Sequence, residues 1–114
     1  MNIRNKKTGN IVRDVRCAQS FFSKVTGLML STQRPLLMIF SKPEKISLHT
    51  WLVFFSLRIY YLDATGVVIE NTLMHPFSFY RPKEFATYVL EVPASYDFRA
   101  DCGDYLLLST NNSR

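Results

Sequence analysis

The chain has 114 residues, of which 47% are apolar and 14% aromatic, and its formal net charge is +5 at pH 7. This size fits one domain with a single core, and the apolar content excludes a disordered tail protein. The longest apolar segment is shorter than the roughly 20 residues of a membrane-spanning helix and contains Arg58, so we expect no membrane span. We expect one domain over residues 1–114, with an ordered core over about residues 2–109 and a polar, frayed tail at 110–114.

The excess positive charge lies near the N-terminus. Residues 1–24 hold six of the 14 basic residues and one of the nine acids, which leaves eight of each for the rest of the chain. No apolar h-region accompanies these charges, so we expect no signal peptide and a cytoplasmic location. A basic arm on phosphates is one interpretation, but the segment lacks the aromatic residues of a single-strand platform, and a solvated hairpin is favoured. We therefore expect no specific nucleic-acid partner, and any DNA or RNA binding should fade steeply with salt.

The N-terminal third predicts a hairpin and then a helix. Asn2–Asn5 and Ile11–Val15 are short extended runs that flank a polar, glycine-containing connection at residues 6–10. From Cys17 onward the apolar residues recur at spacings of three and four, which predicts a short helix that ends near Gly27 with one inward-facing stripe. Two elements of different type therefore precede the central part of the chain.

The next apolar run is Leu36–Phe40, which opens after Pro35 and predicts a strand buried on both faces. A charged turn follows at residues 41–45. The segment Leu48–Asp63, LHTWLVFFSLRIYYLD, is the longest apolar stretch and is predicted to form the core. Strand is favoured over helix there because β-branched and aromatic residues dominate. Alternate positions share one apolar side that we expect to be buried, namely Trp51, Val53, Phe55, Leu57 and Ile59.

The turn Asp63-Ala64-Thr65-Gly66 predicts a hairpin to a partner strand at Val67–Met74. An irregular aromatic connection follows, then a strand at Ala86–Val92 that Pro93 closes, and a last strand at Tyr105–Ser109. Together these elements predict a mainly β domain, α+β by content. We expect a single barrel-like or strongly curved, mostly antiparallel sheet with one short N-terminal helix.

Three short motifs occur in an order and spacing that resembles a known family. They are Gly27-Leu28-Met29, Leu90-Glu91-Val92-Pro93 and Gly103-Asp104. The chain resembles the Domain of Unknown Function 192 family from about Ile11 to Leu108, in a form with a histidine-containing LHTWLV segment that looks archaeal. The resemblance implies a compact, mainly β fold and no established activity. Many members have Pro-(Leu or Ile)-Asp where this chain has Ser56-Leu57-Arg58, so no activity is carried over from the resemblance.

Catalytic and metal-binding patterns are weak in this sequence. The two histidines and two cysteines are far apart and show no metal-ligand spacing, so we expect no metal site. Cys17 and Cys102 could form a disulfide if the fold brings them together, but buried or idle thiols are the default in a cytoplasmic chain. There is no glycine-rich phosphate loop and no nucleophile elbow around a serine. We therefore predict no catalytic residue and no cofactor.

The remaining candidates are polar residues on apolar strands. Arg58 and Glu91 are expected to pair, because an unpaired buried charge is costly, with Asp104 as a third member. One interpretation is a structural ion pair at a barrel rim. The other is a shallow anion-accepting pocket in which Arg58 lies with Thr50 and Tyr60, because the planar guanidinium suits carboxylates and phosphates.

These candidates support a non-catalytic module that binds a small anionic ligand or a protein partner. The alternative is a small enzyme whose site lies on the mixed strand faces around Arg58 and Glu91. We expect a monomer or a weak dimer, without a membrane partner.

Overall fold

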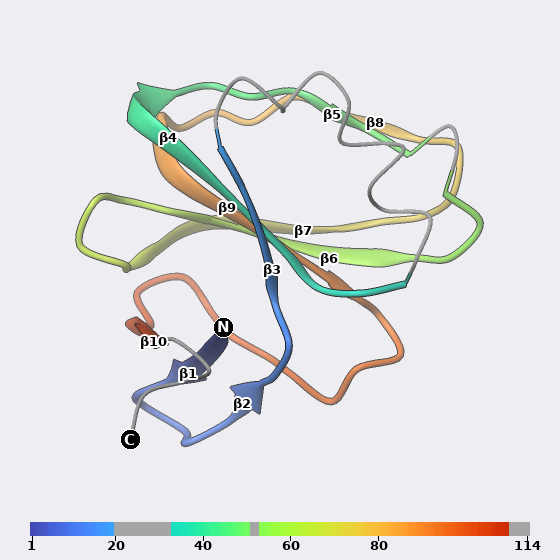
Figure 1. Cartoon of the computed structure of the whole chain (residues 1–114). Coiled ribbons are helices and arrows are strands. Elements are labelled where there is room, and N and C mark those ends of the chain that lie inside the picture. Colours follow the sequence, from blue (N-terminus) through green and yellow to red (C-terminus); the bar gives the residue numbers. More distant parts are fainter. Residues whose placement is uncertain (20–32, 51–52, 110–114) are drawn as a thin grey trace.

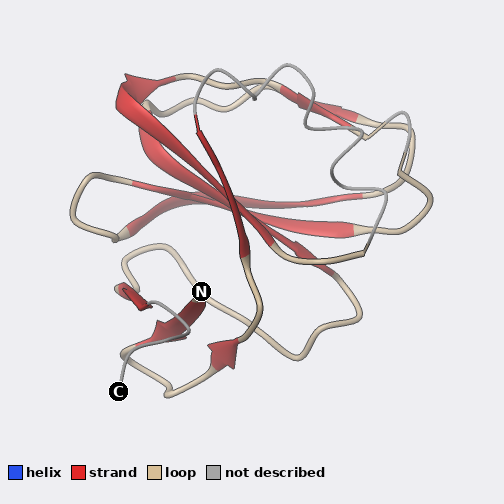
Figure 2. Cartoon of the chain, viewed as in Figure 1, coloured by secondary structure: helices blue, strands red, loops and turns tan. Residues whose placement is uncertain are grey.

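The structure is a computed structural model that describes residues 1–19, 33–50 and 53–109. Its strands form three sheets, and the largest has the order β3-β4-β9-β6-β7 (Figures 1 and 2). These five strands are β3 (Arg16–Gln19), β4 (Leu36–Glu44), β9 (Ala86–Pro93), β6 (Leu57–Leu62) and β7 (Val68–Met74). The neighbours in this sheet are antiparallel, except that β3 runs parallel to β4.

Two small sheets lie on opposite sides of the large one (Figure 1). The first has the order β10-β1-β2 and consists of β10 (Leu106–Ser109), β1 (Asn2–Asn5) and β2 (Ile11–Val12). The second is a ribbon of two short antiparallel strands, β5 (Leu48–His49) and β8 (Phe79–Tyr80). The N-terminal hairpin of the sequence prediction is therefore present as β1 and β2.

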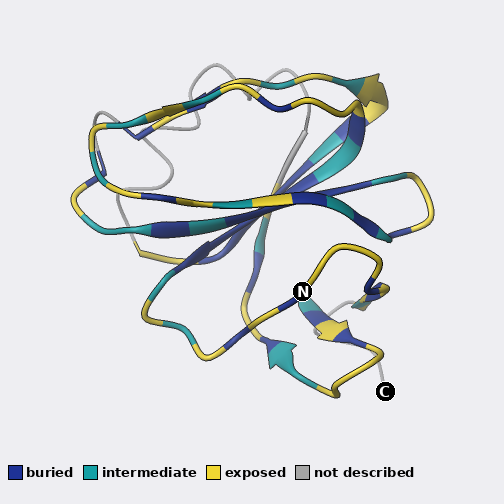
Figure 3. Cartoon of the chain, turned by 180° about the vertical axis from the view of Figure 1, so that it is seen from behind, coloured by how far each residue is buried: buried dark blue, intermediate teal, exposed yellow. Residues whose placement is uncertain are grey.

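Apolar residues on both faces of the large sheet explain this layered arrangement (Figure 3). Leu36, Ile59 and Tyr61 belong to the core cluster that also contains Leu48 of the β5–β8 ribbon. Their strand neighbours Leu37, Tyr60 and Leu62 belong to a second cluster with Ile3, Val12 and Leu106 of the three-stranded sheet. Because successive side chains point to opposite faces, strands with few polar positions need a covering layer on each side.

The predicted barrel-like single sheet with an N-terminal helix is wrong. The described strands form three separate sheets, and none of them closes. Arg16–Gln19, where the helix was expected to start, form strand β3 beside β4, and the described residues contain no helix. The rest of the predicted helix, from residue 20 to its expected end near Gly27, lies outside the described residues. In the part of the chain that is described, no helix is therefore long and apolar enough to cross a membrane.

The central apolar segment is two strands instead of one. It contributes β5 at Leu48–His49 and β6 at Leu57–Leu62, and the described residues between them are not in a strand. The expectation of a shared buried side is confirmed for Val53, Leu57 and Ile59, which are buried in one cluster. Phe55 is only partly buried against that cluster, and Trp51 lies outside the described residues.

Two further elements differ from the prediction in length. The expected charged turn at residues 41–45 is mostly strand, because β4 continues to Glu44 through an irregularity in its register with β9. The aromatic connection after Met74 includes the short strand β8, which pairs with β5. The predicted strands at Leu36–Phe40, Val67–Met74, Ala86–Val92 and Tyr105–Ser109 are confirmed within one residue at their starts.

The turn between β6 and β7 depends on Gly66. Its φ is +96°, and a Cβ there would lie 2.8 Å from the carbonyl oxygen of Leu106. The side chain of Asp63 shapes the same turn by accepting hydrogen bonds from the backbone N–H groups of Thr65 (2.9 Å) and Val67 (3.1 Å). Only glycine fits a position that combines this dihedral with backbone contact.

Replacement of Gly66 by alanine should therefore destabilise the protein by about 2 kcal/mol or more, through both strain and steric overlap. Gly9→Ala is the matched control, because Gly9 has a φ of +81° but no heavy atom within 4 Å of the added Cβ. It should cost about 1 kcal/mol from the dihedral alone. Urea unfolding of both variants measures the difference, and equal losses would contradict the role of the Leu106 contact.

Candidate functional site

A cavity of about 200 Å³ lies beside β6 and β7 and is closed on one side by the loop after β9. Arg58 and Tyr60 reach it from β6, because both point to the face opposite Leu57 and Ile59. Their register partners on β7, Leu73 and Asn71, line the same cavity. The loop contributes Arg99 and Asp101. Two guanidinium groups and one carboxylate thus share one small space.

Arg58 carries a charge that no described acid neutralises. It is half-buried, its Nε is buried without a hydrogen-bond partner among the described residues, and no ion pair with a described acid is recorded for it. An arginine side chain keeps its positive charge in proteins. The charge of Arg58 therefore persists beside the cavity.

Arg99 is held in place by its own loop. Its Nη1 donates to the carbonyl oxygens of Tyr96 (3.1 Å) and Phe98 (2.9 Å), and its backbone N–H donates to Oδ1 of Asn10 at 2.7 Å. Phe98 is fully buried and meets the ring of Tyr60 edge-on, with the ring centroids 5.8 Å apart. The loop is thus fixed by a buried aromatic contact while Arg99 itself is exposed.

The pKa of the Tyr60 hydroxyl depends on the charged groups that line the same cavity. Burial raises the pKa of the Tyr60 hydroxyl and has the largest effect. The guanidinium of Arg58, a backbone hydrogen bond with Ala100 and the guanidinium of Arg99 lower the pKa, and Asp101 raises it. The phenol therefore stays neutral and can donate or accept a hydrogen bond at the cavity. A half-buried cation, an exposed cation and a neutral hydroxyl form a set suited to an anion.

The predicted pairing of Arg58 with Glu91 is wrong. Ile59 pairs with Glu91 across β6 and β9, whereas Arg58 pairs with Val92, so the two charged side chains point to opposite faces of the sheet. Glu91 is fully buried, and neither carboxylate oxygen has a hydrogen-bond partner among the described residues. Burial raises the pKa of Glu91 to about 8. Glu91 is therefore a group of the opposite core cluster and not part of the cavity.

The other two candidates, Thr50 and Asp104, stabilise loops. The hydroxyl of Thr50 donates to the carbonyl oxygen of His75 (2.7 Å) and accepts from the backbone N–H of Ser78 (2.8 Å). Oδ2 of Asp104 accepts from Nδ2 of Asn5 and from the backbone N–H of Asp101, both at 2.9 Å. These two hydrogen bonds hold the pKa of the Asp104 carboxyl below its ordinary value, and the bond from the Asp101 backbone N–H has the larger effect.

Of the five residues chosen from the sequence, the structure thus brings only Arg58 and Tyr60 together. Arg99 is the functional candidate that sequence reasoning missed. It lies in the loop between β9 and β10, and nothing in the local sequence pattern shows which loop folds back over β6. Only the tertiary contact of Phe98 with Tyr60 reveals it.

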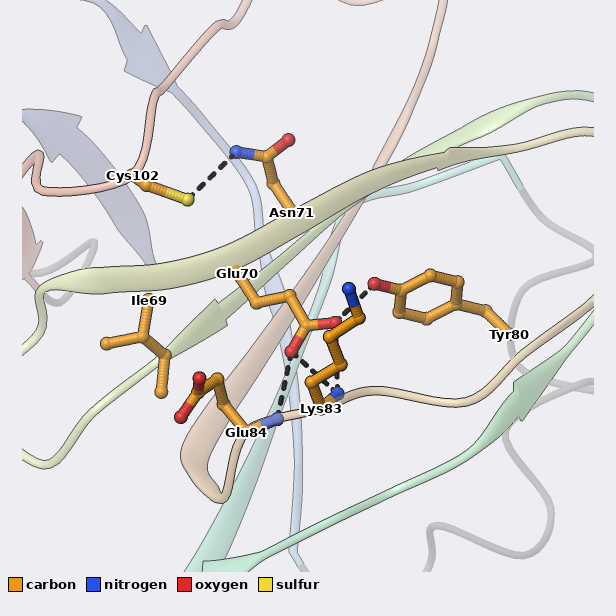
Figure 4. Close-up of a pocket in the computed structure, with 7 residues that line it drawn as sticks. All are labelled: Ile69, Glu70, Asn71, Tyr80, Lys83, Glu84 and Cys102. Atoms are coloured by element: carbon orange, nitrogen blue, oxygen red, sulfur yellow. Dashed lines mark hydrogen bonds between the residues drawn. The ribbon is translucent and has the colours of Figure 1, made fainter.

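A second cavity of about 300 Å³ lies beside β7, and most of its lining side chains are on the side of the β7 ribbon opposite Asn71 (Figure 4). Its walls include Glu70 and Asn71 of β7, Tyr80 of β8, and Lys83 and Cys102. The carboxylate of Glu70 accepts hydrogen bonds from the Tyr80 hydroxyl and from the backbone N–H of Lys83 at 2.9 Å. Burial, with the contact to Glu70, raises the pKa of Tyr80 to about 12. Glu70 is thus a satisfied structural acceptor.

Groups for metal binding or disulfide formation do not gather in the described residues. No three His, Cys, Asp or Glu side chains of the described ranges lie close enough to hold a metal ion. Cys17 and Cys102 are both exposed, free thiols. Cys102 accepts a weak hydrogen bond from Nδ2 of Asn71 at 3.6 Å.

Solved structures with a similar fold come from two bacteria. A crystal structure of a candidate transcription regulator from Sinorhizobium meliloti superposes with a TM-score of 0.76, covers 93% of this chain and 91% of that one, and is 21% identical in sequence. A protein of unknown function from Novosphingobium aromaticivorans gives a TM-score of 0.73, with 94% of this chain and 82% of that one covered at 14% identity. At these identities the likeness concerns the fold alone.

Relatives by sequence are archaeal. A UPF0127 protein of Thermococcus sibiricus is 30% identical over 107 residues, which is 88% of this chain and 70% of the relative. A UPF0127 protein of Pyrococcus horikoshii is 31% identical over 83 residues, which is 70% of this chain and 72% of the relative. The model of the family DUF192, described as Uncharacterized ACR, matches residues 2–100. The chain therefore belongs to the Domain of Unknown Function 192 family.

Proposed function

We propose that this protein is a non-catalytic binding module that holds an anionic group, a carboxylate or a phosphate, between Arg58 and Arg99. The observation that carries the proposal is the unneutralised charge of Arg58 at a cavity that a second guanidinium also lines. Asp101 offsets one of the two positive charges, so the cavity keeps a net positive charge. An anion could accept hydrogen bonds from the guanidinium groups of Arg58 and Arg99 and from the Tyr60 hydroxyl, and its charge would offset the remaining positive charge of the cavity.

The enzyme alternative depends on Arg58 and Glu91 acting together. Their side chains leave the sheet on opposite faces, and Glu91 is fully buried. A shared site would therefore need a different register of β6 and β9. No observation in the described residues favours this alternative over the binding module.

The test is a titration with inorganic phosphate and with succinate, followed by nuclear magnetic resonance at low ionic strength. We expect the resonances of Arg58, Tyr60 and Arg99 to shift. Arg58→Met should weaken binding roughly tenfold or more, because a hydrogen bond to a charged group contributes about 1.5 to 3 kcal/mol.

Arg4→Met is the matched control for this experiment. Arg4 is an exposed arginine of β1 that does not line the cavity, so its replacement removes the same charge elsewhere. Binding by Arg4→Met should stay close to that of the unmodified protein. Equal weakening by Arg58→Met and Arg4→Met would show a general charge effect and overturn the proposed site.

A further inference from the structure

Strand β7 forms one edge of the large sheet, because β6 is its only neighbour among the described strands. At the start of β7 the edge is closed, since Val68 exchanges backbone hydrogen bonds with Gly103 (2.8 Å) and Asp104 (2.9 Å). From Ile69 to Met74, no backbone hydrogen bond to a described segment other than β6 is recorded. In an antiparallel pair, alternate residues turn their N–H and C=O groups away from the neighbouring strand. Alternate residues of this stretch therefore leave a row of backbone donors and acceptors without a recorded partner among the described segments.

This edge lacks the usual protection against an added strand. Natural edge strands are commonly very short, or carry lysine, proline or a bulge that prevents pairing. β7 is seven residues long, VIENTLM, with neither lysine nor proline. Its one acid, Glu70, is buried against Tyr80, and its one irregularity lies at its start, opposite Tyr61 and Leu62. The stretch after Glu70 is regular and open.

The two cavities lie on either side of this open edge. Asn71 lines both cavities, the first together with Leu73 and the second together with Glu70. Figure 4 shows the side chains of Asn71 and Glu70 on opposite sides of the β7 ribbon. In a strand added beside β7, successive side chains would point alternately to these two sides. Backbone hydrogen bonds between the two strands would supply affinity, and the two cavities would select the alternate side chains of the added strand.

We propose that β7 binds an extended acidic peptide segment of a partner protein as an additional strand, with its acidic side chains in the cavity of Arg58 and Arg99. This proposal rests on the proposed function, because the peptide carboxylates occupy the same anion site. The intervening side chains of the peptide face the second cavity, where Lys83 and Glu84 provide polar walls.

Charge favours an acidic partner over a second copy of this chain. In a pair of β7 strands, the only acid that β7 could offer is Glu70, which is buried and already bonded within its own chain. Such a pair would also bring the unneutralised Arg58 groups of two copies toward each other. A foreign acidic strand instead supplies the missing carboxylates.

The test uses a synthetic peptide of about eight residues in which Asp alternates with Thr, a length typical of strands. We expect it to bind and to slow the amide hydrogen exchange of alternate residues between Asn71 and Met74. N-methylation of one alternate set of its amides should weaken binding roughly tenfold or more, and N-methylation of the other set should change it by less than about twofold. Replacing Asp by Asn in the peptide should also weaken binding roughly tenfold.

Succinate and phosphate separate this inference from the proposed function. Both should shift the cavity resonances without slowing exchange along β7. If they bind while N-methylation of either set has no effect on the peptide, strand addition is wrong and the anion site stands. If neither they nor the peptide bind, both proposals fail. Protection of β7 that grows with protein concentration in the absence of peptide would identify a second copy as the occupant and overturn the acidic partner.

Discussion

Tyr61→Ala is expected to lower the free energy of unfolding by about 3 to 5 kcal/mol, enough to unfold a marginally stable domain. Tyr61 is fully buried near the end of β6 and is among the largest fully buried side chains of the described residues. Its ring lies 6.0 Å from that of Tyr80, so it joins the large sheet to the β5–β8 ribbon. The substitution would leave a cavity between two layers. Urea unfolding followed by circular dichroism measures the loss.

Tyr61→Phe separates packing from hydrogen bonding. The Tyr61 hydroxyl donates to the carbonyl oxygen of Ile46 at 3.2 Å, and its removal should cost about 1 kcal/mol. Phe55→Ala is a second comparison, since the sequence alone predicts a loss as large as 3 to 5 kcal/mol for it. Because Phe55 is half-buried and outside a strand, we expect about 1 to 2 kcal/mol instead. A larger loss for Phe55→Ala than for Tyr61→Ala would contradict this description of the core.

Elements set by neighbouring residues were predictable from the sequence. The β6–β7 hairpin follows from Asp63-Ala64-Thr65-Gly66, whose side-chain contacts and positive φ lie within the turn itself. Strand β3 is different. Its residue Ala18 lies at helical spacing with the apolar residues that follow in the sequence, but Arg16–Gln19 pair in parallel with Leu36–Ile39. A pairing between segments that are distant along the chain leaves no local pattern, and here it outweighs helical periodicity.

The candidate site was likewise only partly predictable from the sequence. Arg58 stands out in the sequence because it is a charge within an apolar run, and the structure places it at a cavity. The predicted pairing of Arg58 with Glu91 is wrong because strand register decides whether two residues on neighbouring strands share a face of the sheet. Pairing of Ile59 with Glu91 puts Arg58 on the other face, and a shift of one residue would have reversed that outcome.

The buried carboxyl of Glu91 leads to the prediction with the clearest dependence on pH. Glu91 faces Leu36 of β4 and Ile59 of β6 in the register of the sheet, and no charged group of the described residues contributes to its pKa, which burial alone raises from 4.5 to about 8. In the folded protein Glu91 is therefore protonated up to about pH 8. In the unfolded chain it loses its proton above about pH 4.5.

Between these two values the folded state binds one more proton than the unfolded state, so the free energy of unfolding must fall as the pH rises. The slope is about 1.4 kcal/mol per pH unit, which gives a total of about 5 kcal/mol across the window from pH 4.5 to 8. Asp63 and Asp104 have lowered pKa values, so their contributions are lost only at acidic pH, below this window.

Glu91→Gln should abolish this fall, because the amide does not titrate and has nearly the shape of the protonated carboxyl. The variant and the unmodified protein should have similar stability near pH 4.5, and the variant should be more stable by about 3 to 5 kcal/mol at pH 8. Glu84→Gln, which changes an exposed glutamate, should follow the unmodified protein at every pH. Urea unfolding of the three proteins from pH 4.5 to 8.5 measures these curves. Parallel curves for Glu91→Gln and the unmodified protein would mean that the Glu91 carboxylate is ionised in the folded state, and therefore that a cation or a donor compensates its burial.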